Sequence, residues 1–183
     1  AGGDAATGSR TKAGKGCMMK FGIVSDSSCD LAQEYTEKEK VTIVPFYVSF
    51  DGENYYREGK EIPVTEFYRK MEAQTGCYPK TSMPSVQDYR DAFLPYVMQG
   101  CPVLCICLTK TFSGSMQAAL NAKQELAEEY PDAVIEVMDS QLVTVLQGML
   151  VNEAVKLRNQ GRSLEEAMEA LAPIRSTGHI FFT

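Results

Sequence analysis

Histidine and tryptophan are nearly absent from this sequence, which has one histidine, no tryptophan and six cysteines among 183 residues. His179 stands alone, and no two cysteines have the Cys-x-x-Cys spacing, so the usual ligand pattern of a zinc site is missing. We therefore expect the cysteines to be reduced thiols. Cys105 and Cys107 would point to the same face of one buried strand, where a free cysteine behaves as a small apolar side chain.

Positive charge is also scarce. Lys and Arg number 18 and Asp and Glu number 24, for a formal net charge of −6. Nucleic acids and anionic membrane surfaces bind basic surfaces, so we expect neither as a partner. No apolar run is long enough to cross a bilayer, and residues 1–18 lack the apolar segment of a secretory signal. We expect a cytoplasmic protein without stable membrane insertion.

The pattern of apolar residues divides the chain into three parts. Residues 1–18 have no periodicity and are expected to form a disordered tail. Residues 19–160 alternate strand and amphipathic helix patterns, which is typical of a doubly wound α/β domain with a mostly parallel sheet. Residues 161–183 would begin a second domain and end in an apolar strand over 179–183. We therefore expect the chain to stop before most of that domain.

The most informative stretch runs from residue 101 to residue 119. Residues 103–108 are apolar on both faces, as is typical of a central parallel strand. A hydroxyl-rich loop follows, and Ser113, Gly114 and Ser115 open a helix. Unpaired backbone amides and the positive end of the helix dipole favour an anion at this point.

Other predicted strands also end in polar turns, one after residues 20–24 and one after residues 134–138. Ligands of doubly wound sheets bind at the carboxyl ends of the strands, so these turns are candidate pocket walls. Capping of the next helix explains Asp26 equally well. The candidate pocket residues are Asp26, Ser27, Phe112, Ser115, Asp139 and Ser140.

Between these strands the sequence predicts a hairpin outside the parallel sheet. Residues 41–50 favour a strand in which Pro45 marks a break or a sheet edge, and a turn over residues 51–54 reverses the chain. After Pro63, apolar residues at helical spacing predict an amphipathic helix whose apolar face packs in the core. Those residues are Val64, Phe67, Tyr68 and Met71.

Residues 80–85 are expected to be a polar loop that leads into the next helix. Ser85 and Asp88 have the spacing of a capping box, and Pro95 should kink that helix or divide it in two. A second capping box is predicted to begin at Ser163.

Five segments, in their order and spacing, resemble the DegV family of fatty-acid-binding proteins. They are Ile23–Leu31, Val44–Pro45, Lys80–Ser85, Phe112–Ser115 and Val137–Ser140. The resemblance implies a two-domain α/β protein that buries one long-chain fatty acid, such as palmitate, stearate or oleate, between its domains. It also implies that the carboxylate is presented to a fatty-acid kinase for acyl-phosphate formation. The protein would then be a lipid carrier, without catalytic activity and without a metal or other cofactor.

The resemblance also assigns residues to the carboxylate. The family's carboxylate-binding threonine falls on Thr81, beside Ser82, and its serine falls on Ser113, beside the amide of Gly114. Without the resemblance, Thr81 and Ser82 favour capping and turn chemistry. His179 does not match the family's histidine and takes no role from it. Each buried methylene of an acyl chain would contribute about 0.8 kcal/mol, and hydroxyl and amide donors could hold the head group.

Two other functions stay open at this point. The same helix start could bind a phosphate or nucleotide, although the sequence has no Walker lysine and no Gly-x-Gly-x-x-Gly. Ser113 could be the nucleophile of a hydrolase or acyltransferase, with the amides of Gly114 and Ser115 holding the oxyanion. That function lacks a base and a Gly-x-Ser-x-Gly motif.

Overall fold

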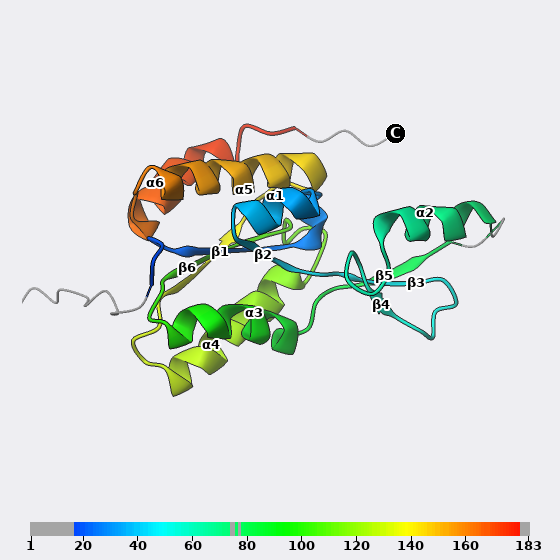
Figure 1. The fold of residues 1–183 in the computed structure, drawn as a ribbon, viewed down its shortest axis with the longest axis horizontal. Helices are drawn as coiled ribbons and strands as arrows, with labels where there is room; N and C mark the ends of the chain where they lie inside the picture. The colour runs from blue at the N-terminus through cyan, green and yellow to red at the C-terminus, as the bar shows by residue number, and fades with distance from the viewer. Residues whose placement is uncertain (1–16, 74–75, 77, 180–183) are drawn as a thin grey trace, which may run out of the picture.

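A parallel sheet forms the centre of the fold (Figure 1). The computed structural model describes residues 17–73, 76 and 78–179. Four parallel strands lie in the order β2, β1, β6 and β7. Their bounds are Gly22–Asp26 (β1), Val41–Val44 (β2), Val103–Cys107 (β6) and Ile135–Asp139 (β7). Every residue of β1 and β6 is buried, as expected for a sheet that is covered on both faces.

Helices cover both faces of the sheet, with α1, α5 and α6 on one side and α3 and α4 on the other (Figure 1). Their bounds are Gln33–Lys38 (α1), Val86–Met98 (α3), Ser115–Glu129 (α4), Thr144–Asn159 (α5) and Leu164–Ile174 (α6). Alternate residues of β6 face opposite layers, so Leu104 packs with α5 and α6 while Cys105 packs with α3 and α4. The prediction of a doubly wound α/β fold with a mostly parallel sheet is confirmed.

The strand order changes direction between β1 and β6. The chain passes from β1 to β2 on one side and later returns to place β6 on the other side of β1. In doubly wound sheets the ligand crevice lies outside the carboxyl ends of the strands at such a point. Asp26 and Cys107, the last residues of β1 and β6, therefore mark where a site is expected.

A second, smaller sheet and one helix form an arm that projects from the α/β layers (Figure 1). The sheet is antiparallel, with three strands in the order β4, β3 and β5. The elements of the arm are Tyr47–Ser49 (β3), Tyr56–Arg57 (β4), Val64–Ala73 (α2) and Lys80–Ser82 (β5). The predicted hairpin and the break at Pro45 are confirmed, since β2 ends at Val44 and β3 begins at Tyr47.

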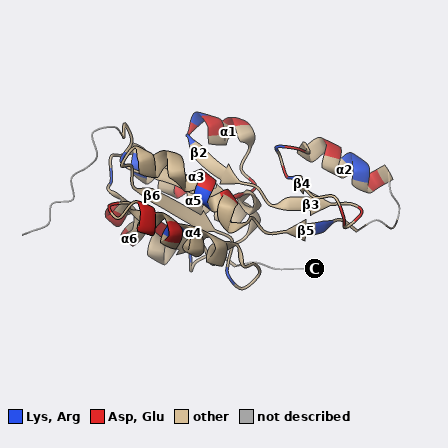
Figure 2. Cartoon of the chain, turned by 90° about the horizontal axis from the view of Figure 1, so that it is seen from below, with Lys and Arg blue, Asp and Glu red and all other residues tan. Residues whose placement is uncertain are grey.

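Two predictions about the arm are wrong. Residues 80–82 are not loop, because they pair with β3 as strand β5. Helix α2 buries none of its residues, and Val64 and Tyr68 are 54% and 58% exposed. The apolar spacing does mark a helix, but this helix lies on the projecting arm rather than against the core. Figure 2 shows acidic and basic residues on this helix, and Arg69 pairs there with Glu66 at 2.7 Å.

Two helices begin at the capping residues that the sequence predicts. Ser85 with Asp88, and Ser163 with Glu166, form the two predicted capping boxes. Pro95 does not divide its helix, because α3 continues to Met98.

The cysteines include one disulfide, so the expectation of reduced thiols throughout is wrong. Cys17 and Cys101 are bonded, with their Cα atoms 5.1 Å apart. These residues precede β1 and β6, which are neighbouring parallel strands, so the two chain segments meet at the amino-terminal ends of these strands. Cys29, Cys105 and Cys107 are free and buried, whereas Cys77 lies outside the described residues.

The expected domain boundary at residue 160 stays a prediction. Helix α6 follows that boundary, and its residues Leu164, Ala167 and Leu171 share a core cluster with α5. The expected tail lies outside the described residues up to residue 16, and most of the expected strand over 179–183 does so as well.

Candidate functional site

The segment between β6 and α4, residues 108–114, brings the predicted anion-binding residues to the carboxyl end of the sheet; we call it the β6–α4 loop. The fold uses several of its amides. Thr109 donates to the carbonyl of Leu142 at 3.1 Å, and Lys110 donates to Asp139 Oδ1 at 3.4 Å. Over the described part of the chain, the amides of Ser113 and Gly114 have no hydrogen-bond partner. These two groups are therefore available to an anion.

Ser113 stands at the end of this loop and is half buried. Its Oγ accepts a hydrogen bond from the amide of Ser115 at 3.1 Å, which ties the loop to the first turn of α4. The hydroxyl hydrogen of Ser113 is not used in that bond and can be donated to another group. One hydroxyl and two backbone amides thus form a set of donors beside the start of a 15-residue helix.

Thr81 and Ser82 lie on the arm, in strand β5, where Thr81 pairs with Val48 and Ser82 pairs with Tyr47. Both residues are exposed. The role of these two residues as carboxylate ligands stays a prediction.

Met83 follows β5 in the chain and packs against Gly114, the N-cap residue of α4. Its Sδ lies 2.8 Å from the position that a Cβ would take on Gly114. A side chain at residue 114 would therefore displace the thioether of Met83. Thr81 is only two residues from Met83, so the chain brings the two segments that carry the predicted ligands close together.

The candidate pocket residues in the first turn are already engaged within the fold. Asp26 is completely buried, and its carboxylate accepts hydrogen bonds from the amide of Leu108 and the hydroxyl of Ser115. Ser27 donates to Glu58 Oε2 at 2.7 Å and accepts from the amide of Phe46 at 3.0 Å. Ser27 therefore connects this turn to the segments that begin and end the β3–β4 hairpin.

The remaining candidate pocket residues differ in exposure. Phe112 is 56% exposed, whereas Ser115 and Ser140 are completely buried. Asp139 Oδ1 accepts from the amides of Lys110 and Gln141, so this carboxylate holds the middle of the β6–α4 loop. Their contact with a ligand stays a prediction.

Burial changes the acidity of two groups near these turns. It raises the pKa of the Cys29 thiol to about 11, which keeps this cysteine protonated and unreactive. Burial also raises the pKa of the Tyr89 phenol well above its ordinary value, so its hydroxyl remains a hydrogen-bond donor.

Three further observations concern a serine nucleophile, a metal site and a membrane span. Within the described ranges, no histidine or carboxylate is hydrogen-bonded to Ser113. Among the same residues, no cluster of three or more His, Cys, Asp or Glu side chains could hold a metal ion. None of the described helices has the length and apolar character needed to cross a membrane.

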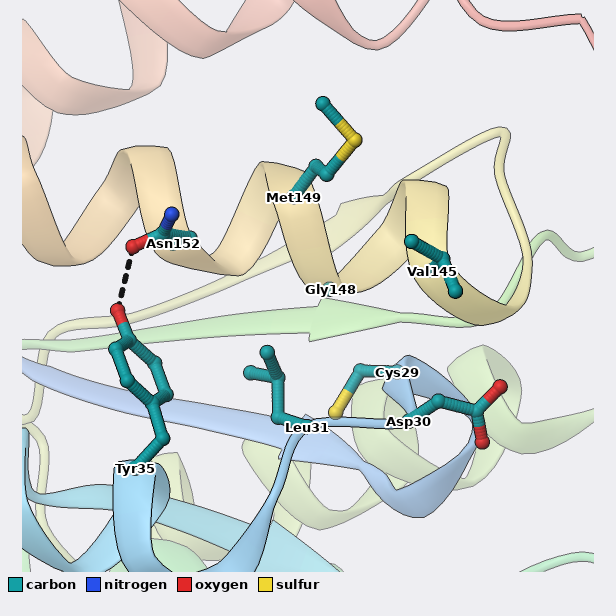
Figure 3. Close-up of a pocket in the computed structure, with 8 residues that line it drawn as sticks. All are labelled: Cys29, Asp30, Leu31, Tyr35, Val145, Gly148, Met149 and Asn152. Carbon is teal, nitrogen blue, oxygen red and sulfur yellow. Dashed lines mark hydrogen bonds between the residues drawn. The ribbon is translucent and has the colours of Figure 1, made fainter.

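A pocket that the sequence did not indicate lies between the turn after β1 and helix α5 (Figure 3). It has a volume of about 240 Å³, and Tyr35 donates to Asn152 Oδ1 beside it at 2.5 Å. The lining residues are Cys29, Asp30, Leu31, Tyr35, Val145, Gly148, Met149 and Asn152. None of the predicted carboxylate ligands lines this pocket.

Sequence reasoning missed the residues that connect the site to its surroundings. Met83 lies inside the matched segment Lys80–Ser85 but has no predicted role, and no sequence motif singles out Gln147. Gln147 is completely buried and donates to Asp26 Oδ1 at 2.9 Å. A buried glutamine gives no periodic signal of its own, so it could not have been found from the sequence.

Residues 20–183 match the family described as "Uncharacterised protein, DegV family". This chain belongs to the DegV family. A DegV domain-containing protein of Clostridium perfringens is 31% identical over 150 residues, which is 81% of this chain and 51% of that protein. The chain spans about half the length of the curated DegV relatives it matches.

Solved structures of fatty-acid-binding proteins resemble this fold closely. A stearic-acid-binding protein from Eubacterium ventriosum is 50% identical with a TM-score of 0.80, over 83% of this chain and 52% of that chain. A fatty-acid-binding DegV protein from Thermus thermophilus is 31% identical with a TM-score of 0.75, over 86% of this chain and 54% of that chain. The structural neighbours of this DegV chain are thus described as fatty-acid-binding proteins.

Proposed function

We propose that this chain binds the carboxylate of a long-chain fatty acid at the start of α4. The observation that supports the proposal is the contact of Met83, two residues from Thr81, with Gly114 of the β6–α4 loop. The hydroxyl of Ser113 and the amides of Ser113 and Gly114 supply hydrogen bonds to the anion. Thr81 adds a hydroxyl from the arm. The similar solved structures that are described as fatty-acid-binding support the choice of ligand.

The acyl chain requires apolar surface next to these donors. Phe112 lies two residues before Gly114 in the chain, and Met83 contacts Gly114 in space. Their side chains are 56% and 47% exposed, respectively. We assign the first methylenes of the fatty acid to these two side chains. Each methylene that leaves water contributes about 0.8 kcal/mol, so the tail supplies most of the affinity and the head group supplies orientation.

The first experiment identifies the ligand that accompanies the purified protein. Denaturation, solvent extraction and mass spectrometry should detect a long-chain fatty acid. Free amides at a helix start also suit a phosphate, so a nucleotide in the extract would replace the lipid proposal by the phosphate alternative.

The second experiment tests the head-group residues by substitution. Thr81→Val and Ser113→Ala should each weaken fatty-acid binding by about ten- to a hundredfold, because a hydrogen bond to a charged group contributes roughly 1.5–3 kcal/mol. Thr65→Val, at an exposed position of α2, is the matched control and should bind like the unaltered protein. Unchanged affinity in both Thr81→Val and Ser113→Ala would contradict the assignment.

We further propose that the bound carboxylate is presented to a fatty-acid kinase, which forms the acyl phosphate. The protein itself then acts as a carrier and not as the catalyst. A fatty-acid kinase, ATP and fatty acid should yield acyl phosphate faster when this protein delivers the lipid. Equal rates with and without the protein would refute this step.

A further inference from the structure

The carboxylate of Asp26 holds both ends of the β6–α4 loop. Its Oδ2 accepts a hydrogen bond from the amide of Leu108 at 2.9 Å, and the same oxygen accepts one from the hydroxyl of Ser115 at 3.0 Å. Leu108 begins the loop and Ser115 is the first residue of α4. The residues between these two contacts include Ser113 and Gly114. One oxygen atom therefore fixes the entrance and the exit of the segment that carries the proposed donors.

The other oxygen of Asp26 is held from the opposite face of the sheet. Oδ1 accepts from Gln147 Nε2 of α5 at 2.9 Å and lies 2.5 Å from the hydroxyl oxygen of Ser28. Gln147 Nε2 also donates to Ser25 Oγ at 3.1 Å, so its side chain is itself fixed. The position of the carboxylate is thus set by α5 on one side and by the β6–α4 loop on the other.

The link to α4 continues into α3. Tyr89 OH lies 2.5 Å from Ser115 Oγ. Tyr89 OH also lies within donating distance of Asp26 Oδ2, at 3.4 Å, so the hydroxyls of Tyr89 and Ser115 both face this carboxylate oxygen. Ser115, Tyr89 and Asp26 are all completely buried. In the described part of the chain, no Lys or Arg side chain is hydrogen-bonded to Asp26, so neutral donors alone hold this carboxylate.

We propose that Asp26 is a positioning residue for the β6–α4 loop rather than a ligand of the fatty acid. This inference rests on the proposed function for its consequence in binding. Asp26 sits behind the loop, in the interior, and acts by fixing Leu108 and Ser115. The donors of Ser113 and Gly114 then stand ready before the ligand arrives, so that binding does not have to order them.

The first test measures the loop without any ligand. Asp26→Asn keeps the shape of the side chain but replaces one acceptor oxygen by an NH₂ group. Hydrogen exchange at the hydrogen-bonded amides of Leu108, Thr109, Lys110 and Phe112 should accelerate at least about tenfold, in proportion to easier local opening. Ser28→Ala is the matched control, because it removes a partner of Asp26 Oδ1 and leaves both loop contacts in place. Equal exchange in Asp26→Asn and the unaltered protein would overturn the proposal.

The second test measures fatty-acid affinity at a temperature where each variant is folded. Asp26→Asn and Ser115→Ala should each weaken binding of oleate about tenfold, since each loosens the same loop. Combining Asp26→Asn with Ser113→Ala should cost less than the sum of the two single effects, because both act through one set of donors. Strict additivity would overturn the positioning role. If Asp26→Asn does not fold, Ser115→Ala carries both tests with the same expected outcomes.

The two measurements separate this proposal from the proposed function. If the unaltered protein does not bind oleate, the fatty-acid proposal fails, and the exchange result still decides whether Asp26 holds the loop. If the protein binds oleate and Asp26→Asn leaves both exchange and affinity unchanged, the positioning proposal alone fails.

Discussion

The hydroxyl of Tyr47 lies 2.9 Å from Oδ1 and 3.0 Å from Oδ2 of Asp88 and donates to this carboxylate. Tyr47 belongs to strand β3 of the arm, whereas Asp88 belongs to helix α3 of the α/β layers. Arg57 of β4 approaches the same carboxylate, with its Nη2 atom 3.6 Å from Oδ1. Tyr47 also pairs with Ser82 in the neighbouring strand. This contact therefore sets the position of the strand that carries Thr81.

Removing the hydroxyl should release the arm. We expect Tyr47→Phe to lower the free energy of unfolding by about 1 kcal/mol, the usual net value of one hydrogen bond. Fatty-acid affinity should fall as well, because Thr81 is held less firmly beside Gly114. Chemical denaturation and a binding titration measure the two effects. Tyr68→Phe, on the exposed face of α2, should change neither quantity. Stability loss with unchanged affinity would separate the arm from the ligand and count against Thr81.

The lowered pKa of Asp88 predicts that the free energy of unfolding depends on pH. Burial raises the pKa of its carboxyl, but hydrogen bonds from Ser85 and Tyr47 and the charge of Arg57 outweigh burial, so the pKa lies below its ordinary value. A lowered pKa stabilises the fold above the ordinary range near 3.9, and that contribution is lost as the pH falls through the folded value. Asp88→Asn should therefore be less stable than the unaltered protein at pH 6, with the gap closing below about pH 4.

Urea denaturation at several pH values between pH 6 and pH 2 measures this gap. Asp91→Asn is the control, since Asp91 is an exposed residue on the same helix and, among the described residues, has Gln87 as its one hydrogen-bond partner. A gap of constant size over the whole range would show that Asp88 acts through its shape and not through its charge.

The parallel sheet and its helices could be predicted because their signals are local. Apolar residues at strand or helix spacing, together with caps such as Ser163, are read within a few positions of the chain. The exposure of Tyr68 could not be predicted in this way. Its spacing identifies one face of α2, but what lies against that face depends on the direction in which the arm leaves the sheet.

In the candidate site, too, local features could be predicted from the sequence and long-range contacts could not. The β6–α4 loop was predictable, because a strand pattern, a hydroxyl-rich loop and a helix start follow one another directly. The role of Asp26 was not, because its partner Gln147 is 121 positions away. From the sequence Asp26 was equally well explained as a cap or a ligand. Its complete burial between two helical layers distinguishes it from a residue that meets solvent.

The disulfide between Cys17 and Cys101 gives a direct chemical prediction. When the protein is denatured without a reductant, iodoacetamide should leave these two residues unlabelled, and both should react after reduction. Cys29 is free, so it should be labelled under both conditions and serves as the internal control. Reduction should also lower the free energy of unfolding by about 2–4 kcal/mol. Peptide mapping that finds Cys17 labelled before reduction would refute the bond.

Gly114 allows the contact between the arm and α4 to be tested directly. Its φ of −77° suits any residue, so a substitution there introduces no backbone strain. A Cβ would instead meet Met83 Sδ at 2.8 Å and push the thioether away. We expect Gly114→Ala to weaken fatty-acid binding about fivefold, equivalent to roughly 1 kcal/mol. Loss of the preferred residue at the helix N-cap adds a small cost to the free energy of unfolding.

A double-mutant cycle distinguishes the contact from the capping effect. Gly114→Ala should cost less affinity when Met83 is already Ala, because the atom that would be displaced is gone. The capping cost, by contrast, is the same in both backgrounds and shows in the free energy of unfolding. Isothermal titration with oleate, repeated for the four proteins of the cycle, measures the coupling. A coupling of zero would mean that Met83 does not link the two ligand-bearing segments, and the proposed meeting of Thr81 with Ser113 would lose its main support.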